Sequence, residues 1–335
     1  MEIPSRMRAA WYERTGPAHE VLAVGDLPTA APGPGQVLVR VAASGVNPHD
    51  TKKRSGWTGG TMQAERVIPH GDGAGTVVAV GRGVDAARVG ERVWLYRGDA
   101  GHPGGGTAAE YCTVPAAFAH VLPDGVEFAI GAGLGVPAMT AHRAVFADGP
   151  VEGQTVLVTG GAGAVAVYAI QFARNGGARV LATASSAEKA AIAGEMGAEA
   201  VIDYRTEDVV ARVAALTGGQ GVHRIIEVDF GANLAAAVQV IRPQGVIAAY
   251  SSTRVREPVL PYYSLQAKAV VLRTVQGLLL TEPQRAEAVD AIANLLRQDR
   301  LRHPRRHGFP LARIADAHAA LESGSLVGKA VLEIS

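Results

Sequence analysis

The sequence predicts an α/β protein with two domains, one mostly β and one built on a doubly wound parallel sheet. Three observations predict this fold class. The chain has 335 residues, which is more than one domain usually holds. Short strand-like runs separated by Gly and Pro turns fill the part before residue 125. From residue 152 onward, strand-like and helical runs alternate, which is typical of parallel sheets covered by helices.

The mostly β domain is predicted from apolar runs that turn residues interrupt. These runs span residues 37–42, 75–80, 92–96 and 109–114. Beyond residue 260 the chain returns to short apolar pieces, with one helix at 284–297 and a last strand-like run at 329–334. We expect this C-terminal part to rejoin the first domain. The predicted boundaries are 1–128 and 269–335 for the mostly β domain and 129–268 for the parallel-sheet domain.

The parallel-sheet domain is predicted from its alternation of short apolar runs and longer helical segments. Helices are expected at residues 165–174 and 187–196. Strands are expected at residues 155–159, 179–184, 200–203, 224–228 and 245–250. A six-stranded nucleotide-binding sheet fits this spacing.

A glycine cluster, Gly160-Gly161-Ala162-Gly163, follows the first of these strands and opens a helix. The free N–H groups and the dipole of a helix N-terminus attract a phosphate, and glycines let a pyrophosphate approach the backbone. The same cluster is also compatible with a simple tight turn. The strand, cluster, helix and strand order favours a dinucleotide site, although Ala166 replaces the last glycine of the pattern.

The second predicted strand ends in Thr183-Ala184-Ser185-Ser186. It lacks the Asp or Glu that, in NAD-preferring enzymes, accepts a hydrogen bond from the ribose 2′-hydroxyl at this position. Hydroxyl groups and the nearby Lys189 suit a 2′-phosphate, which an aspartate would repel. The sequence therefore predicts NADPH as the cofactor. Ser185 or Ser186 is equally suited to cap the following helix, and the two roles are compatible.

Composition narrows the remaining possibilities. A formal net charge of +1, with acids and bases interspersed, gives no attraction for nucleic acid. No apolar run approaches the ~20 residues of a membrane span, and the N-terminal residues do not form a signal peptide. We expect a cytoplasmic protein. The single cysteine, Cys112, excludes an intramolecular disulfide and a cysteine-based zinc cluster.

Several segments, taken in order, resemble one family. They are Asn47-Pro48-His49-Asp50, Gly71-Asp72-Gly73-Ala74-Gly75, Gly106-Thr107-Ala108-Ala109-Glu110-Tyr111, Val201-Ile202-Asp203-Tyr204 and Gly328-Lys329. The chain resembles the zeta-crystallin-like quinone oxidoreductases, the zinc-free branch of the medium-chain dehydrogenase/reductase superfamily. The resemblance implies a Rossmann domain and a GroES-like catalytic domain.

The zinc-dependent members of this superfamily have a cysteine where Asn47 stands and a His-Glu pair where Gly71-Asp72 stands. Neither ligand set is present here, and one cysteine cannot build their four-cysteine lobe. His303 and His307 are four residues apart, but Pro304 argues against a helix that would align them. No metal site is predicted.

By resemblance, Asn47 and Asp50 are the catalytic candidates. In one interpretation, the Asn47 amide contacts the cofactor and donates a hydrogen bond to the carbonyl of the substrate that accepts the hydride. In the other interpretation, Asn47 is a turn residue before Pro48. Asp50 is expected to orient the loop, and Lys52 stands where the family often has a tyrosine. The other implied cofactor contacts are Thr140, Ala162, Gly163, Ala164, Val165, Ser185, Lys189, Tyr204, Phe230, Tyr250, Ser251 and Lys329. Phe230 and Tyr250 are equally plausible as core aromatic residues.

The resemblance implies hydride transfer from NADPH to a quinone or related conjugated carbonyl, such as an enone, in a homodimer joined along nucleotide-domain sheet edges. Two alternatives stay open. One is a reductase of enoyl thioesters or other activated alkenes, which uses the same hydride geometry. The other is a non-catalytic crystallin-like or RNA-binding role, against which the weak net charge and the cofactor motif argue.

Overall fold

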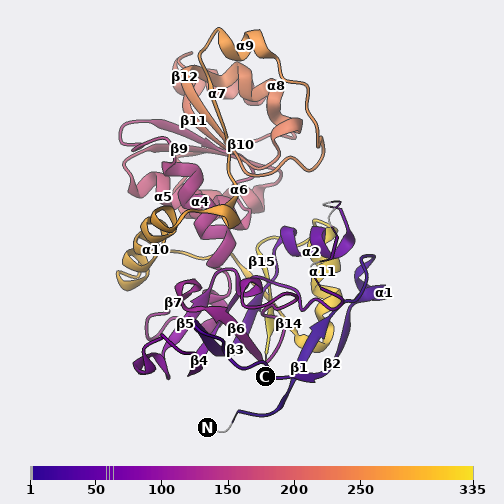
Figure 1. Ribbon diagram of the computed structural model, residues 1–335. Helices are drawn as coiled ribbons and strands as arrows, with labels where there is room; N and C mark the ends of the chain where they lie inside the picture. Colours follow the sequence, from indigo (N-terminus) through magenta and orange to yellow (C-terminus); the bar gives the residue numbers. More distant parts are fainter. Residues whose placement is uncertain (1–2, 58, 60, 63, 335) are drawn as a thin grey trace. The chain divides into compact units, whose positions relative to one another are not determined.

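The computed structural model describes residues 3–57, 59, 61–62 and 64–334. The chain forms two compact units, each of which contains its own main sheet. After the domains that the resemblance implies, we name them the catalytic unit, which comprises Met1–Val136, Ala291–Arg300 and Arg305–Ser335, and the nucleotide unit, which comprises Pro137–Asp290 and Leu301–Pro304. Figure 1 shows their elements, coloured along the chain.

The catalytic unit is mostly β, as the sequence predicts. Its main sheet has the order β14-β15-β3-β4-β5-β7, with β6 paired to β3 beside that path, and β1 and β2 form a separate antiparallel pair. The strands are β1 (Arg6–Trp11), β2 (Ala23–Pro28), β3 (Gln36–Gly45), β4 (Asp72–Val80), β5 (Arg92–Leu95), β6 (Tyr111–Pro115), β7 (Ala119–Val121), β14 (Arg306–Pro310) and β15 (Lys329–Glu333).

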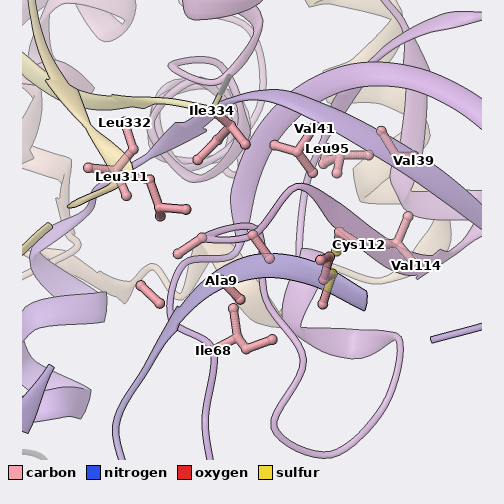
Figure 2. Close-up of a cluster of buried hydrophobic side chains, with 14 of the residues drawn as sticks. Ala9, Val39, Val41, Ile68, Leu95, Cys112, Val114, Leu311, Leu332 and Ile334 are labelled. Carbon is pink, nitrogen blue, oxygen red and sulfur yellow. The ribbon is translucent and has the colours of Figure 1, made fainter. Parts of the chain in front are cut away.

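Apolar side chains from distant segments fill one core in this unit (Figure 2). Val39 and Val41 of β3 lie in it together with Leu95 of β5 and Leu332 of β15, which explains why the C-terminal strand rejoins the first domain. The helices that lie wholly in this unit are α1 (Ala18–Val21), α2 (Pro48–Ser55), α3 (Phe128–Gly131) and α11 (Ile314–Glu322).

The nucleotide unit contains a six-stranded sheet, all of whose pairings are parallel. Its order, β10-β9-β8-β11-β12-β13, is that of a Rossmann fold, with the chain reversing direction across the sheet at β8 and β11. The strands are β8 (Thr155–Val158), β9 (Arg179–Ala184), β10 (Ala200–Asp203), β11 (Val222–Glu227), β12 (Ile241–Ala249) and β13 (Val271–Thr274). The predicted fold class is thus confirmed.

Helices pack on this sheet through apolar faces. Leu234 and Val240 on one of them join Ile225 and Ile247 of the central strands in a buried cluster. The helices are α5 (Ala164–Asn175), α6 (Ala187–Met196), α7 (Val209–Thr217), α8 (Phe230–Val240) and α9 (Tyr262–Gln266), while α4 (Gly135–Phe146) and α10 (Glu282–Arg297) each contribute residues to both units.

The nucleotide unit extends beyond residue 268, where the sequence places its end, because β13 pairs with β12. β13 is an edge strand whose end residues, Val271 and Thr274, are exposed, and Arg273 within it binds Asp148. This exposed strand lacks the continuous apolar pattern of a central parallel strand.

A search of the described residues for a bilayer-spanning helix found none with sufficient length and hydropathy.

Candidate functional site

The glycine-rich turn lies where the sequence predicts it, between β8 and α5. Gly160 has φ +65°, a backbone conformation that glycine adopts without strain. Its N–H donates to Thr183 Oγ1 over 3.0 Å, and the N–H of Gly161 donates to the Thr183 carbonyl over 2.8 Å. A Cβ on Gly161 would lie 2.8 Å from that of Ala193, so glycine is required for α6 to pack here.

The N-terminus of α5 fits a phosphate group. Gly163 is the N-cap residue and has no side chain to occupy the first N–H groups of the helix, to which Ala164 and Val165 belong. A Cβ at Gly163 would meet only the Gly160 carbonyl, at 3.2 Å, so the backbone is open to an approaching pyrophosphate. Ala166 is fully buried, which agrees with the packing role of that position.

Three of the predicted cofactor contacts gather at the carboxyl end of β9. Lys189 Nζ donates to Ser185 Oγ over 3.1 Å, and the N–H of Tyr204 donates to the Ala184 carbonyl over 3.1 Å. Ser186 caps α6 by accepting from the Lys189 N–H, so the capping role belongs to Ser186 and leaves Ser185 beside the lysine. Hydroxyl groups and an ammonium group therefore stand where an NAD-preferring enzyme has an acid.

Phe230, Tyr250 and Ser251 come together at the ends of β11 and β12. The N–H of Phe230 donates to the Ser251 carbonyl over 2.9 Å, and the N–H of Tyr250 donates to the Glu227 carbonyl over 3.1 Å. The side chain of Phe230 packs in the hydrophobic core, so the structure favours its core role. Burial raises the pKa of the Tyr250 hydroxyl, which stays protonated.

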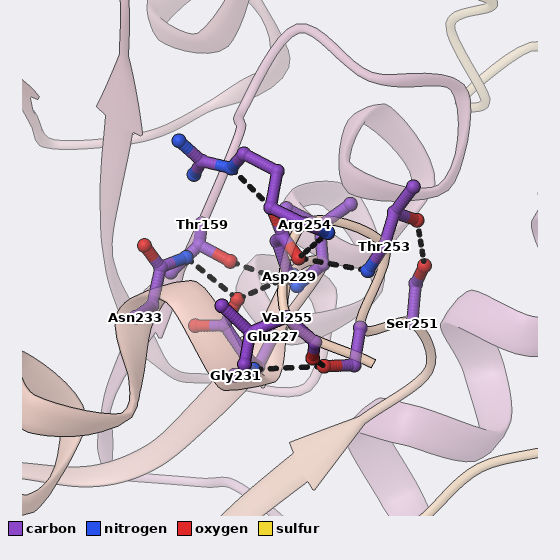
Figure 3. Close-up of polar contacts among 11 residues, drawn as sticks. Thr159, Glu227, Asp229, Gly231, Asn233, Ser251, Thr253, Arg254 and Val255 are labelled. Carbon is purple, nitrogen blue, oxygen red and sulfur yellow. Dashed lines mark hydrogen bonds and ion pairs between the residues drawn. The ribbon is translucent and has the colours of Figure 1, made fainter. Parts of the chain in front are cut away.

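A polar network, shown in Figure 3, holds the Ser251 loop in place. Asp229 Oδ1 accepts from the N–H groups of Thr253 and Arg254, and its Oδ2 lies 2.5 Å from Arg254 Nε. Glu227 Oε1 accepts from Asn233 over 2.8 Å and from the Asp229 N–H over 2.6 Å. Sequence reasoning missed this network, because Glu227, Asp229 and Arg254 have no distinguishing spacing in the sequence.

Thr140 lies on α4 and is buried within the nucleotide unit. A Cβ at Gly277 would come 2.1 Å from its Oγ1, so the 3-10 turn Gly277–Leu279 packs directly on this hydroxyl. The structure does not bring Thr140 into a hydrogen bond with the other predicted contacts among the described residues.

In the catalytic unit, Asn47 lies between a buried lysine and a buried carboxylate. Its Nδ2 donates to Asp72 Oδ2 over 2.7 Å, and its Oδ1 accepts from Lys329 Nζ. The ammonium group can only donate and an ionised carboxylate can only accept, so these partners fix the orientation of the amide. Asp72 takes one of the two amide N–H hydrogens and leaves the other for a further acceptor.

Lys329 thus belongs to the Asn47 cluster in the catalytic unit, whereas the resemblance groups it with the cofactor contacts Phe230, Tyr250 and Ser251. Lys329 Nζ also lies 3.7 Å from Asp72 Oδ2, and both side chains are buried. The reason is positional, since β15 pairs with β3 and Lys329 is its first residue. Burial lowers the pKa of Lys329, while Asp72 and Asp50 oppose this shift.

Asp72 is further held by the N-terminus of α4. The N–H of Val136 lies 2.9 Å from Asp72 Oδ1 and 3.0 Å from its Oδ2. A Cβ at Gly135 would come 2.0 Å from Oδ1, so only glycine admits this contact. Burial raises the pKa of Asp72, and Lys329 and Asn47 counteract that rise. Sequence reasoning matched Asp72 to a motif but assigned it no role.

Asp50 fixes the loop that presents Asn47. Its Oδ2 accepts from the Asn47 N–H over 2.7 Å, in the manner of a capping box at the start of α2. Burial, and next the neighbouring Asp72, raise the pKa of Asp50 to about 7. The turn role considered for Asn47 is therefore real, since Asn47 is the N-cap residue, and it coexists with the amide contacts described above.

The Asn47 cluster does not fit a zinc ion. An ammonium group occupies the position beside the amide oxygen and the carboxylate, and it repels a divalent cation. Within the described part of the chain, no three His, Cys, Asp or Glu side chains gather in a metal-binding group.

Comparison with known proteins agrees with these two units. Residues 33–124 match the family of alcohol dehydrogenase GroES-like domains, and residues 164–295 match the family described as zinc-binding dehydrogenases. A quinone oxidoreductase of Pseudomonas aeruginosa is 30% identical over 320 residues, covering 93% of this chain and 95% of its own.

Two solved structures extend the comparison. A mycobacterial protein solved in complex with NADPH is 30% identical, with a TM-score of 0.85 over 98% of this chain and 99% of its own. An NAD-dependent alcohol dehydrogenase is 28% identical, with a TM-score of 0.90 over 98% of this chain and 100% of its own. The chain therefore belongs to the zeta-crystallin-like quinone oxidoreductases of the medium-chain dehydrogenase/reductase superfamily.

Proposed function

We propose that this protein is an NADPH-dependent reductase of quinones or related conjugated carbonyl compounds that works without zinc. The observation that carries the proposal is the Asn47 cluster, in which the ammonium group of Lys329 stands among the potential ligand oxygens. Oxidation of an alcohol needs a stabilised alkoxide, which zinc supplies as a Lewis acid. Reduction of an electron-poor acceptor needs less stabilisation of the negative charge that develops on its oxygen, and a hydrogen bond from a neutral amide can supply it.

The nucleotide unit supports the choice of NADPH. The N-terminus of α5 would hold the pyrophosphate through Ala164 and Val165, and Ser185, Lys189 and Tyr204 would hold the 2′-phosphate. The mycobacterial relative solved with NADPH supports the same assignment. Bound there, NADPH supplies the hydride.

The catalytic unit would act on the acceptor through Asn47. Asp72 and Lys329 orient the amide, and its second N–H donates to the acceptor oxygen on which negative charge develops. Asp50 holds the backbone of Asn47, so the donor is in place before the acceptor binds.

The proposal is tested with an acceptor panel. NADPH oxidation is followed with simple quinones, enones and enoyl thioesters, and zinc in the purified protein is measured by elemental analysis. We expect quinones or enones to be reduced by protein that contains no stoichiometric zinc. If only enoyl thioesters are reduced, the result supports the alternative activity. If the protein holds about one zinc ion per chain tightly and loses its activity when the zinc is removed, the result contradicts the proposal.

We also propose that the protein is a homodimer joined along the β13 edge of the nucleotide unit. β13 pairs only with β12 among the described strands, and nearby apolar side chains are exposed, including Val259 at 92% and Tyr263 at 79%. Exposed large apolar side chains that gather into a patch often mark a protein–protein interface. The family resemblance noted above favours an interface along an edge of the nucleotide-domain sheet.

A further inference from the structure

A basic cluster borders the Asn47 loop in the catalytic unit. We define it as His49, Lys52, Lys53 and Arg97. The first three lie on α2, at spacings of three and four residues that place them on one face of the helix. The opposite face carries the buried Asp50, Thr51 and Arg54. α2 begins directly after Asn47, so the basic face starts beside the proposed donor.

Arg97 joins this face from a separate loop. The loop is anchored beside the Asn47 cluster, since the N–H of Gly98 donates to the carbonyl of Gly71, the residue before Asp72, over 2.7 Å. Arg97 itself has φ +59°, an uncommon conformation for a residue other than glycine. Arg97 acts on His49 of α2 through its charge, which adds to the lowering of that imidazole's pKa by burial, while its guanidinium carbon lies 5.7 Å from the centroid of the Phe118 ring.

One carboxylate, Asp99, links the two segments. Its Oδ2 lies 3.6 Å from Lys53 Nζ, and its Oδ1 lies 4.0 Å from Arg97 Nε. Lys52 Nζ lies 4.5 Å from the centroid of the Trp57 ring. Lys52, Lys53, Arg97 and the partly buried Asp99 all act on His49 through their charges, and cations outnumber carboxylates among these four groups.

The two carboxyl groups of the Asn47 cluster contribute little negative charge to this region. Asp72 is paired with Lys329, and the pKa of Asp50 is raised to about 7 by burial, which leaves that carboxyl partly protonated near neutral pH. The pKa of His49 is lowered by burial and then by Lys53, which keeps the imidazole neutral and able to donate a hydrogen bond. The side chains of Lys53 and Asp99 are about three-quarters buried, so salt screens them less than surface charges.

We propose that the preferred acceptor carries an anionic group, received by the basic cluster while Asn47 binds the carbonyl. This deepens the proposed function and rests on it. The class comprises conjugated carbonyl compounds with a carboxylate, sulfonate or phosphate. That anion belongs either to a small acceptor or to the coenzyme A portion of an enoyl thioester, and the two sources share the same chemistry.

Matched acceptor pairs test the proposal. The first pair is 1,4-naphthoquinone-2-sulfonate and 1,4-naphthoquinone, and the second is crotonyl-coenzyme A and crotonyl-N-acetylcysteamine. After correction for the reactivity of each quinone toward NADPH in buffer, we expect kcat/KM to be at least about tenfold higher for the charged member of one pair, within the range of electrostatic steering. The pair that shows this preference identifies the source of the anion.

Charge-removing variants connect that preference to the cluster. Lys52→Gln combined with Lys53→Gln should lower kcat/KM for the charged acceptor far more than for its neutral partner, and Arg97→Gln should act in the same direction. Arg82→Gln is the control, since it removes one exposed positive charge in the same unit. Arg82 follows the C-terminal end of β4, whereas Asp72 is the first residue of that strand. Added salt should reduce the preference of the parent protein for the charged acceptor. It should have little effect in the double variant, which has already lost most of that preference.

Binding of naphthalene-2-sulfonate, which cannot be reduced, gives a readout without turnover. Calorimetry should show its affinity fall in the Lys52→Gln/Lys53→Gln variant and not in Arg82→Gln. Equal kcat/KM within both pairs, or equal losses for charged and neutral acceptors in the variants, overturns the inference. If neutral acceptors are reduced well, the proposed function survives that result, whereas reduction of no acceptor at all refutes the proposed function itself.

Discussion

Lys189 Nζ and Ser185 Oγ lie 3.1 Å apart at the carboxyl end of β9, with Tyr204 attached to the same strand end. This arrangement makes the cofactor preference testable. NADPH should bind more tightly than NADH, since a charge-assisted hydrogen bond contributes ~1.5 to 3 kcal/mol, or roughly tenfold to a hundredfold. Lys189→Glu should remove most of that preference and change NADH affinity little, because the 2′-hydroxyl carries no charge.

Paired titrations with NADPH and NADH measure this effect. Arg212→Glu on α7 is the control, since it makes the same charge change on the surface of the same unit. Equal binding of both cofactors by the parent protein, or equal losses for both in Lys189→Glu, would show that Lys189 is a surface lysine. The result bears on the relatives too, because one structural neighbour is described as NAD-dependent.

Asn47→Ala should lower turnover with a quinone while the fold remains intact. Loss of one oxyanion donor typically costs ~10² in kcat, and the cost here should be of that size or smaller. Ser55→Ala at the end of α2 is the control for disturbance of the helix. Stopped-flow measurement of NADPH oxidation under single-turnover conditions isolates the hydride step. Unchanged turnover would leave Asn47 with its capping role alone.

The Asp72 and Lys329 pair should show strong coupling in stability. Lys329→Met alone or Asp72→Asn alone leaves an uncompensated charge in a buried site, which typically costs about 3 to 5 kcal/mol of unfolding free energy. The double variant should lose clearly less than the sum of the two single losses. Urea unfolding of all four proteins gives the coupling energy, and additive losses would show that the two groups act independently.

Much of the fold was predictable from the sequence because its signals are local. The alternation around Gly160–Gly163 predicted β8, α5 and β9 within one or two residues. β13 was missed, because an exposed edge strand with Arg273 inside it lacks the pattern of a buried parallel strand.

The site was predictable only in part, for a related reason. Ser185 and Lys189 are four positions apart and were both predicted as contacts of the 2′-phosphate, so a local signal was enough to group them. Lys329 and Asn47 are 282 positions apart, and only the pairing of β15 with β3 brings them together. The resemblance placed Lys329 among the cofactor contacts, which stays a prediction, and it gave no indication that Lys329 would bind Asn47.

Asp50 should make the stability of the protein depend on pH. Its pKa is raised to about 7 in the folded protein, so between about pH 4 and pH 7 the folded state binds a proton that the unfolded state has released. This contribution to stability is complete at pH 4 and is lost as the pH rises to 7.

Asp50→Asn cannot ionise and still offers an oxygen to the Asn47 N–H. Its unfolding free energy should therefore rise relative to the parent as the pH increases from 4 to 7, by up to about 4 kcal/mol. Chemical unfolding of both proteins across this range measures the difference, and the other titrating groups cancel in it. A difference that does not change with pH would place the Asp50 pKa near its ordinary value.

The homodimer should depend on the exposed apolar surface near β13. Tyr263 lies on α9 with 79% of its surface exposed, and a charge in the middle of an apolar interface is left desolvated and unpaired. Tyr263→Glu should therefore convert the dimer to a monomer at micromolar concentration. Val89→Glu in the catalytic unit is the control, since Val89 is also an exposed apolar residue, at 50%. Sedimentation velocity separates the two states. A parent protein that sediments as a monomer, or a Tyr263→Glu protein that remains dimeric, would exclude this edge as the interface.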